Sequence, residues 1–287
     1  MDAWSVMKTK MVFLIFLSAI YCVASLAGMA GQSGEKPVRV AVIGGMTMTN
    51  LWSELQNRFE AETGIPVRVV ATGQKPKLIR AMKEGKVDFL TMHSSDQTSN
   101  LVADGYAKDL RPWTKNELVI VGPSSDPAGI CGMTDGAGAI KRIASVKANW
   151  LDFQSNGPRE TAHTLFANAG VRMTGSWILK DESANDKAIL QYAEKKNAYM
   201  IIGRMAIVFK KMEPNPGIKI MVQGDPNMLR PYMMMVANPE TFPQANVEGA
   251  VKLSEFLLSA KVQKFLAGYD GGIGDGRPIF FPIISRK

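Results

Sequence analysis

Hydroxyl, amide and guanidinium side chains gather in three short segments of this chain. A dehydrated oxyanion needs hydrogen bonds that replace those it made with water, and hydroxyls, backbone N–H groups and a guanidinium can supply them. Each of these residues is also an ordinary helix cap or turn residue. The candidate anion ligands are Thr47, Thr49, Asn50, Ser94, Ser95, Ser155, Asn156 and Arg159.

The first segment belongs to residues 38–55, VRVAVIGGMTMTNLWSEL. The apolar run Val38–Ile43 predicts a strand, Gly44 and Gly45 interrupt it, and helical spacing begins near Asn50 after a short polar loop. The first N–H groups of a helix lack intrahelical partners and can bind an anion. The pattern therefore fits an anion pocket, although any strand–helix junction of an α/β domain has the same form.

The same alternation continues through the next fifty residues. We expect helices at 51–63, 77–83 and 96–104 and strands at 67–71 and 87–92. Such alternation predicts a parallel sheet with right-handed crossovers, and ligands of such sheets bind beyond the carboxyl ends of the strands. Those ends, at 44–50, 72–74 and 93–95, should converge on one cleft. His93 lies there, either as a hydrogen-bond donor to the anion or as a simple edge residue.

A second α/β module follows. The strand-like run 117–121 enters the turn-rich segment GPSSDPAGI, where we expect a crossing into a second domain, and PYMMMVANP from Pro231 predicts the return. Expected helices are 136–147, 159–168, 185–195 and 204–211, and expected strands are 149–151, 198–202 and 218–222. Helix 247–258 should pack back on the first module. The prediction is a two-domain α/β protein with two crossover hinges and an interdomain ligand cleft, made of domain I (37–121 plus 232–287) and domain II (122–231).

Residues 1–30 predict a secretory signal peptide, since Lys8 and Lys10 precede the apolar run Met11–Leu17 and small residues follow at 24–30. A retained membrane anchor is the alternative. Cleavage would lower the net charge from +8 to +7. A positive charge attracts anions without selecting one, and the absence of basic–aromatic clusters argues against nucleic acid. Only Cys131 would remain after cleavage, so no internal disulfide is expected.

Several long stretches resemble the substrate-binding component of tungstate ABC transporters, a family within the type II periplasmic binding proteins. They are VVATGQKPKLIRAMKEGKVDFLTMH, NELVIVGPSSDPAGI, AEKKNAYMIIGR and QGDPNMLRPYMMMVANPETFP. The resemblance implies a periplasmic binding protein that captures a small oxyanion, tungstate or molybdate first, and delivers it to an ABC transporter permease. Arg204 matches an arginine of that family, either as a ligand residue or as a structural one. We expect a monomer.

The departures from the family fall in its ligand loops. The family has a Thr/Ser-rich run where this chain has Gly44–Thr49, an Arg-Gly-Asp-Asp-Ser-Gly-Thr-His type of loop where it has residues 152–159, and a Gly-Met-Gly type of loop where it has residues 182–186. Phosphate, sulfate or an organic acid therefore remain alternative ligands. A ligand sensor without transport is the alternative role.

Other chemistry is less well supported by the sequence. Met46, Met48, Met92 and Met233–Met235 with His93 would suit Cu(I), although methionines usually fill cores. His163 has no nearby His or Cys partner and fits a structural role. No catalytic motif has the required spacing, so we predict a binding protein that is not an enzyme and has no cofactor or metal site. Met46 joins Thr47, Thr49 and Asn50 as a candidate of the first loop.

Overall fold

The computed structural model describes residues 35–180, 188–209 and 217–283. The predicted signal peptide, the loop 182–186 and parts of the expected helices 185–195 and 204–211 lie outside these ranges. Pro37–Lys287 forms one compact unit. None of the helices within the described ranges is both long and apolar enough to cross a membrane.

The first part of the chain forms the predicted parallel sheet. β1 (Val38–Ile43) pairs in parallel with β2 (Val67–Gly73) and with β3 (Phe89–His93). Helices α3 (Leu51–Thr63), α4 (Lys75–Lys83) and α5 (Asp96–Ala103) alternate with these strands. Gly64 ends α3 in the left-handed conformation at φ 73°. Helix α4 begins two residues earlier than expected, because Pro76 is tolerated in a first helical turn.

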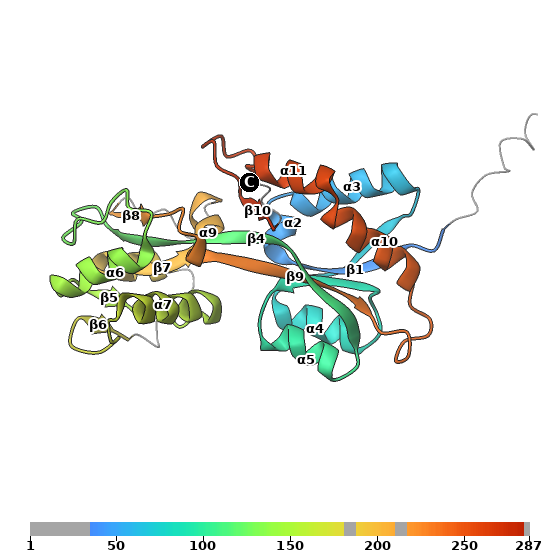
Figure 1. Ribbon diagram of the computed structural model, residues 1–287, viewed down its shortest axis with the longest axis horizontal. Helices are drawn as coiled ribbons and strands as arrows, with labels where there is room; N and C mark the ends of the chain where they lie inside the picture. The colour runs from blue at the N-terminus through green and yellow to red at the C-terminus, as the bar shows by residue number, and fades with distance from the viewer. Residues whose placement is uncertain (1–34, 181–187, 210–216, 284–287) are drawn as a thin grey trace, which may run out of the picture. The chain divides into compact units, whose positions relative to one another are not determined.

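Two long antiparallel strands extend this sheet. β4 (Ala107–Pro123) has 17 residues, many more than the five expected, and β9 (Leu229–Ala237) pairs with its first half. The sheet order is β10-β4-β9-β3-β1-β2, with β10 (Phe280–Pro282) at the edge. The second half of β4 pairs with β7 (Met200–Gly203) and β8 (Ile218–Val222). β4 therefore pairs with strands of both groups, and β9 brings the chain back from the second group to the first (Figure 1).

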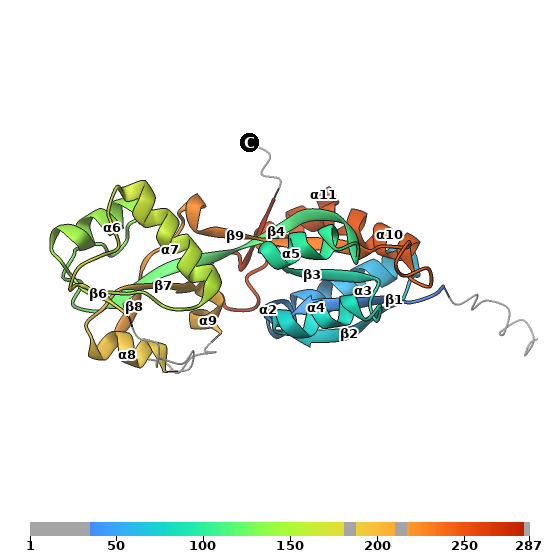
Figure 2. The same ribbon diagram turned by 90° about the horizontal axis from the view of Figure 1, so that it is seen from below.

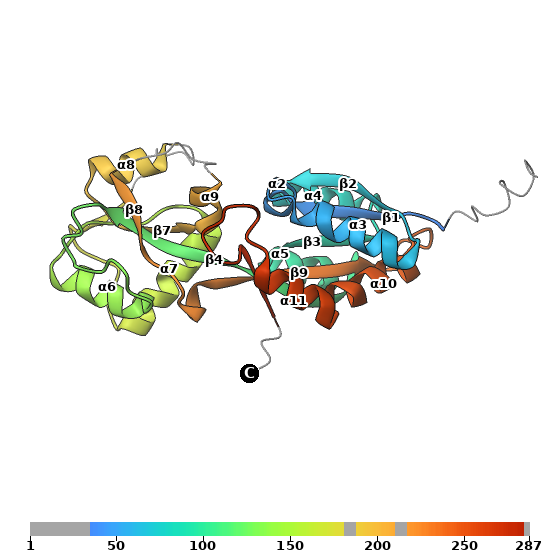
Figure 3. The same cartoon turned by 90° about the horizontal axis from the view of Figure 1, so that it is seen from above.

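Helices cover both faces of each group of strands. Figure 1 shows α3, α10 (Val247–Leu258) and α11 (Ala260–Gly268) on one face of the β1–β9 sheet, and α4 and α5 on the other. Figures 2 and 3 show α6 (Gly136–Ser145) and α7 (Asn156–Ala169) on one side of β4, β7 and β8, and α8 (Ile189–Lys195) on the other. Further elements are α2 (Gly44–Met48), β5 (Trp150–Leu151), β6 (Ile178–Leu179), α9 (Arg204–Val208) and η1 (Pro226–Met228).

The hydrophobic cores follow the same division. One cluster contains residues from 38–113 and from 232–280, together with Met205. Two further clusters contain only residues between 118 and 228. Helix α7 begins three residues earlier than predicted, since Pro158 fits its first turn, and α6 ends at Ser145 shortly before Lys147, which has a φ of 53°. Helix α11 and strand β10 were not predicted.

Candidate functional site

The segment after β1 is a short helix, α2 (Gly44–Met48), and not the open polar loop that the sequence suggested. The Thr47 hydroxyl donates to Gly44 O (3.0 Å), and its oxygen lies 3.0 Å from the Thr72 hydroxyl at the end of β2. A side chain on Gly44 would lie 3.3 Å from the backbone of Gly73, so glycine permits this close approach of the two strand ends. The contact brings two of the predicted ligand segments together.

The other candidates of the first segment have different surroundings. Met46 is fully buried in the core, and Thr49 is 2% exposed. The Thr49 hydroxyl donates to Gly45 O (2.9 Å), and its carbonyl accepts from the Tyr269 hydroxyl (2.6 Å). Asn50 is exposed and left-handed at φ 60°, directly before α3. Within this segment, Thr47 alone keeps a partly exposed hydroxyl beside a second strand end.

At the end of β3, the His93 ring stacks on the Tyr232 ring of β9, with centroids 4.2 Å apart. Ser94 N donates to Pro231 O (3.0 Å), and the Ser94 side chain is half-buried. Tyr232 is fully buried, yet its hydroxyl has no hydrogen-bond partner within the described residues. Burial raises the pKa of Tyr232, so the phenol stays neutral and its proton is available to an acceptor.

A guanidinium lies beside these groups. Arg230 Nη2 donates to Ser94 O (3.4 Å), and the same guanidinium packs over Gly157 in the first turn of α7. A Cβ added to Gly157 would lie 2.9 Å from Nη2 and nearer still to Cζ and Nη1. Arg230 therefore spans from the end of β3 to the start of α7. Burial lowers the pKa of Arg230, while Tyr232 and Glu160 raise it.

Lys75 supplies a second cation near this place. It opens α4 directly after β2 and is half-buried. Burial and the charge of Arg230 lower the pKa of Lys75 to about 8, and Glu160 and Asp96 act in the opposite direction. The ion pairs within the described residues include neither Lys75 nor Arg230.

Among the candidates from the second module, Arg159 has an ion-pair partner. Ser155 is half-buried and precedes α7, whereas the Asn156 side chain lies outside what the structure describes. Arg159 forms an ion pair with the buried Asp152, with both bonds at 3.3 Å. Arg159 remains 42% exposed at its side chain, so it can turn toward a ligand only by leaving Asp152.

Arg204 and Glu117 are the buried members of a cluster of charges that also contains the more exposed Asp275 and Arg277. Arg204 pairs with Asp275 and lies 3.8 Å from Glu117, and Arg277 donates to both oxygens of Glu117 (3.0 and 3.1 Å). Glu117 also accepts from Gly224 N (2.6 Å). The Arg204 side chain is 3% exposed and lies close to both carboxylates. These surroundings fit a structural role for Arg204, the alternative to a ligand role.

Sequence reasoning did not select Arg230, Lys75, Tyr232 or Thr72. Two features of the sequence pointed toward these residues. Thr72 and Lys75 lie at either side of the predicted end of the second strand. Arg230 and Tyr232 lie on either side of Pro231, where the chain was predicted to return to the first domain. Both features concerned position in the fold, and neither concerned chemistry. The methionines Met46, Met92, Met234 and Met235 are fully buried and fill the core. Within the described residues, no three His, Cys, Asp or Glu side chains are grouped to hold a metal.

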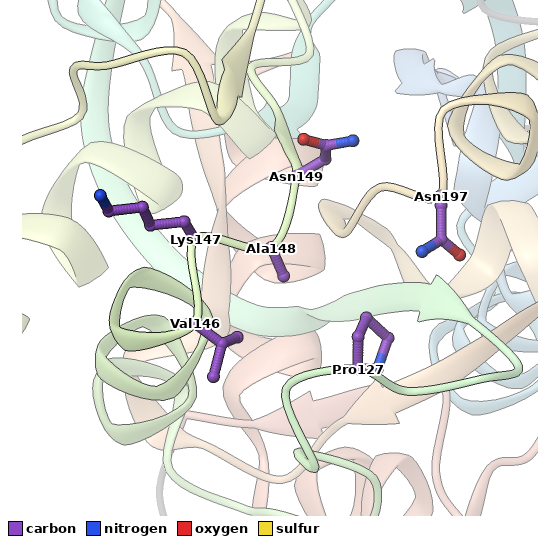
Figure 4. A pocket seen from close by; sticks show the side chains of 6 residues that line it. All are labelled: Pro127, Val146, Lys147, Ala148, Asn149 and Asn197. Carbon is purple, nitrogen blue, oxygen red and sulfur yellow. The ribbon is translucent and has the colours of Figure 1, made fainter.

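A separate pocket lies among turns of the second module (Figure 4). It is lined by residues of the turns after α6 and α8 and by a proline after β4. None of the candidate residues is among them. The lining residues are Pro127, Val146, Lys147, Ala148, Asn149 and Asn197.

A family model described as bacterial extracellular solute-binding protein matches residues 40–269, and the chain belongs to this family. One similar protein has a name that specifies its ligand. The chain is 27% identical over 241 residues to the tungstate-binding protein TupA of Peptoclostridium acidaminophilum, covering 83% of this chain and 82% of that protein.

Solved structures agree with this assignment. The tungstate-binding protein TupA of Desulfovibrio alaskensis is 25% identical, with a TM-score of 0.71 over 87% of this chain and 100% of that one. The tungstate ABC transporter structure from Geobacter sulfurreducens, 24% identical, shares the fold with a TM-score of 0.64 over 82% of this chain and 99% of that one. The predicted family and the predicted two-domain type II periplasmic-binding-protein fold are thereby confirmed.

Proposed function

We propose that this chain is a periplasmic receptor that captures a small oxyanion and hands it to the permease of an ABC importer. Tungstate and molybdate are the first candidates, because proteins similar to this chain over most of its length are tungstate-binding proteins. The role is binding without catalysis, with the monomer as the working unit. The signal peptide predicted at residues 1–30 would direct the chain to the periplasm.

The observation that carries the proposal is the guanidinium of Arg230. A partly buried cation without a counter-ion is costly, because the protein interior replaces few of its interactions with water. Arg230 donates only to Ser94 O within the described residues, so most of its N–H groups remain available. An oxyanion beside Arg230 would supply the missing charge and accept two parallel hydrogen bonds.

Groups from several elements would complete this site. We propose direct contacts from Thr47, His93, Ser94, Ser155 and Asn156, with backbone N–H groups of Gly44 and Gly45, together with Arg230 and the Tyr232 hydroxyl. A Cβ added to Gly45 would lie 3.6 Å from that hydroxyl. Met46, Thr49 and Asn50 hold α2 in position. In this proposal Arg159 exchanges Asp152 for the ligand, and Arg204 supports the site from its cluster with Glu117 and Asp275.

The site would lie between two domains that close over the anion. We propose domain I as residues 37–121 plus 232–287 and domain II as residues 122–231. The separate hydrophobic clusters support this division, and β4 and β9 are the two connections between the parts. Arg230 is a ligand residue that stands on one of these connections.

A thermal-shift panel tests the proposal, since a ligand that binds only the folded state raises its apparent stability. The panel contains tungstate, molybdate, sulfate, phosphate, small organic acids and Cu(I). We expect an oxyanion to raise the melting temperature, and to raise it much less in Arg230→Gln. The exposed Arg172→Gln is the matched control. If an organic acid or Cu(I) stabilises the protein and no oxyanion does, the proposal is wrong.

A transport role and a sensing role differ in the partner protein that the ligand-loaded chain binds. A permease and an ATPase encoded beside this chain favour import, whereas a neighbouring histidine kinase favours sensing. Stimulation of the ATPase by the ligand-loaded protein in reconstituted vesicles would establish delivery. Absence of any stimulation by a fully loaded protein would favour the sensor.

A further inference from the structure

We propose that Lys75 is the second cation of the oxyanion site and that Lys75 and Arg230 together select doubly charged over singly charged anions. The inference rests on the proposed function, because it concerns the same site. It adds a specificity-determining residue that was not among the candidates from the sequence.

Lys75 lies at the carboxyl end of β2, close in sequence to the Thr72–Thr47 contact. Lys75 opens α4 three residues after Thr72, and the Thr72 hydroxyl lies 3.0 Å from that of Thr47. Arg230 reaches the same edge of the sheet from β9, through its bond to Ser94 O at the end of β3. After burial, the positive charge of Arg230 is the next largest cause that lowers the pKa of Lys75. The carboxyl ends of β2 and β3 thus each carry a cation.

Within the ranges that the structure describes, neither cation forms an ion pair with a carboxylate. The charged groups that act on Lys75 are Arg230 from β9, Glu160 from α7 and Asp96 from α5. Both carboxylates, those of Glu160 and Asp96, belong to exposed residues, where water screens their charge. Two half-buried cations that repel each other are unfavourable in the empty site. A dianion between them would turn this repulsion into two attractions.

A proton uptake follows from this arrangement. Burial and Arg230 lower the pKa of Lys75 to about 8, so a fraction of the lysines in the empty protein is neutral in mildly alkaline solution. A bound dianion favours the ammonium form and raises this pKa again. Above about pH 8, binding must therefore take up a proton, and affinity falls as the pH rises.

The test compares tungstate with perrhenate, a tetrahedral monoanion of similar size. Isothermal titration should show that Lys75→Gln weakens tungstate binding about tenfold or more, the usual size of a charge-assisted hydrogen bond, while perrhenate binding changes less than about threefold. Lys75→Arg should restore tungstate affinity and abolish its decline between about pH 7 and about pH 9.5, because arginine stays charged. The exposed Lys77→Gln in the same helix is the control.

The outcomes separate this inference from the proposed function. If Lys75→Gln loses tungstate and perrhenate equally, or if it keeps the wild-type affinity and pH profile, Lys75 does not select charge, and the oxyanion function stands. If the wild-type protein binds no oxyanion, the proposed function fails and this inference with it. Lys75→Arg keeps the question decidable should Lys75→Gln fold poorly.

Discussion

Gly157→Ala offers a way to move Arg230 without replacing it. Gly157 is the second residue of α7, and the Arg230 guanidinium packs directly against it. The added methyl would approach Nη2 to 2.9 Å and two other guanidinium atoms more closely, whereas ordinary contacts begin near 3.4 Å. An arginine side chain is flexible at its end, so the guanidinium will move and the helix will stay.

The expected changes in stability and in affinity have opposite signs. Alanine in place of a helical glycine stabilises a protein by roughly 0.5–1 kcal/mol, and by less in a first turn. Displacing the guanidinium removes a hydrogen bond to a charged group, worth roughly 1.5–3 kcal/mol, which corresponds to an affinity about 10- to 150-fold weaker. The variant should therefore unfold at the same temperature or a higher one, and bind its anion poorly.

Thermal unfolding without ligand and isothermal titration with tungstate or molybdate measure the two effects. Gly268→Ala in the last turn of α11 is the matched control, because a Cβ at that position meets nothing within 4 Å. It should leave binding unchanged. Wild-type affinity in Gly157→Ala would refute the reasoning that the present position of Arg230 is needed for the ligand.

Three further predictions concern single side chains. In Lys75→Met the ligand-free protein should be more stable than wild type at neutral pH. The pKa of Lys75 is about 8 in the folded protein and about 10.4 in the unfolded chain, so the stability of the wild type should rise with pH between these values. Melting curves measured at several pH values should show this rise in the wild type and not in the variant. Tyr232→Phe removes a buried hydroxyl without a partner among the described residues, so the melting temperature of the empty protein should hold or rise while oxyanion affinity in titration falls about fivefold or more. Asp88→Asn should lower the free energy of unfolding in denaturant by about 3 kcal/mol and leave ligand affinity unchanged. The fully buried Asp88 accepts hydrogen bonds from Arg39 Nη2 (2.6 Å), Arg39 N (2.8 Å) and Asn246 N (3.0 Å), and it raises the pKa of Arg39. Unchanged unfolding in Asp88→Asn would contradict that estimate.

The sequence predicted the regular parts of this fold because local patterns determine them. β1, β8 and α10 have the predicted boundaries, since apolar runs and helical spacing define their ends. The first half of β4 was missed, because the segment AKDLRPWTK mixes charged residues with a proline and is fixed by pairing with β9 and β10. Pairing across more than a hundred residues leaves no local signal.

The sequence predicted where the candidate site lies, but it predicted only some of the residues that form it. The strand ends were found from topology, and the hydroxyl residues there were found from their types. Arg230 contacts Ser94, 136 positions earlier in the chain, and such a contact follows from tertiary packing alone. Lys75 and Arg230 are two of 34 basic residues, and residue type does not single them out. The surroundings of Thr49 and Arg204 likewise depend on partners that are distant in sequence.

Isothermal titration of the protein with tungstate and molybdate, in wild type and in Arg230→Gln, tests the central claim most directly. We predict one bound oxyanion per chain in the wild type and in the Arg172→Gln control, with affinity at least about tenfold weaker in Arg230→Gln. Failure of both anions, and of sulfate and phosphate, to bind the wild type would contradict the oxyanion assignment. Equal affinity in Arg230→Gln and wild type would contradict the site.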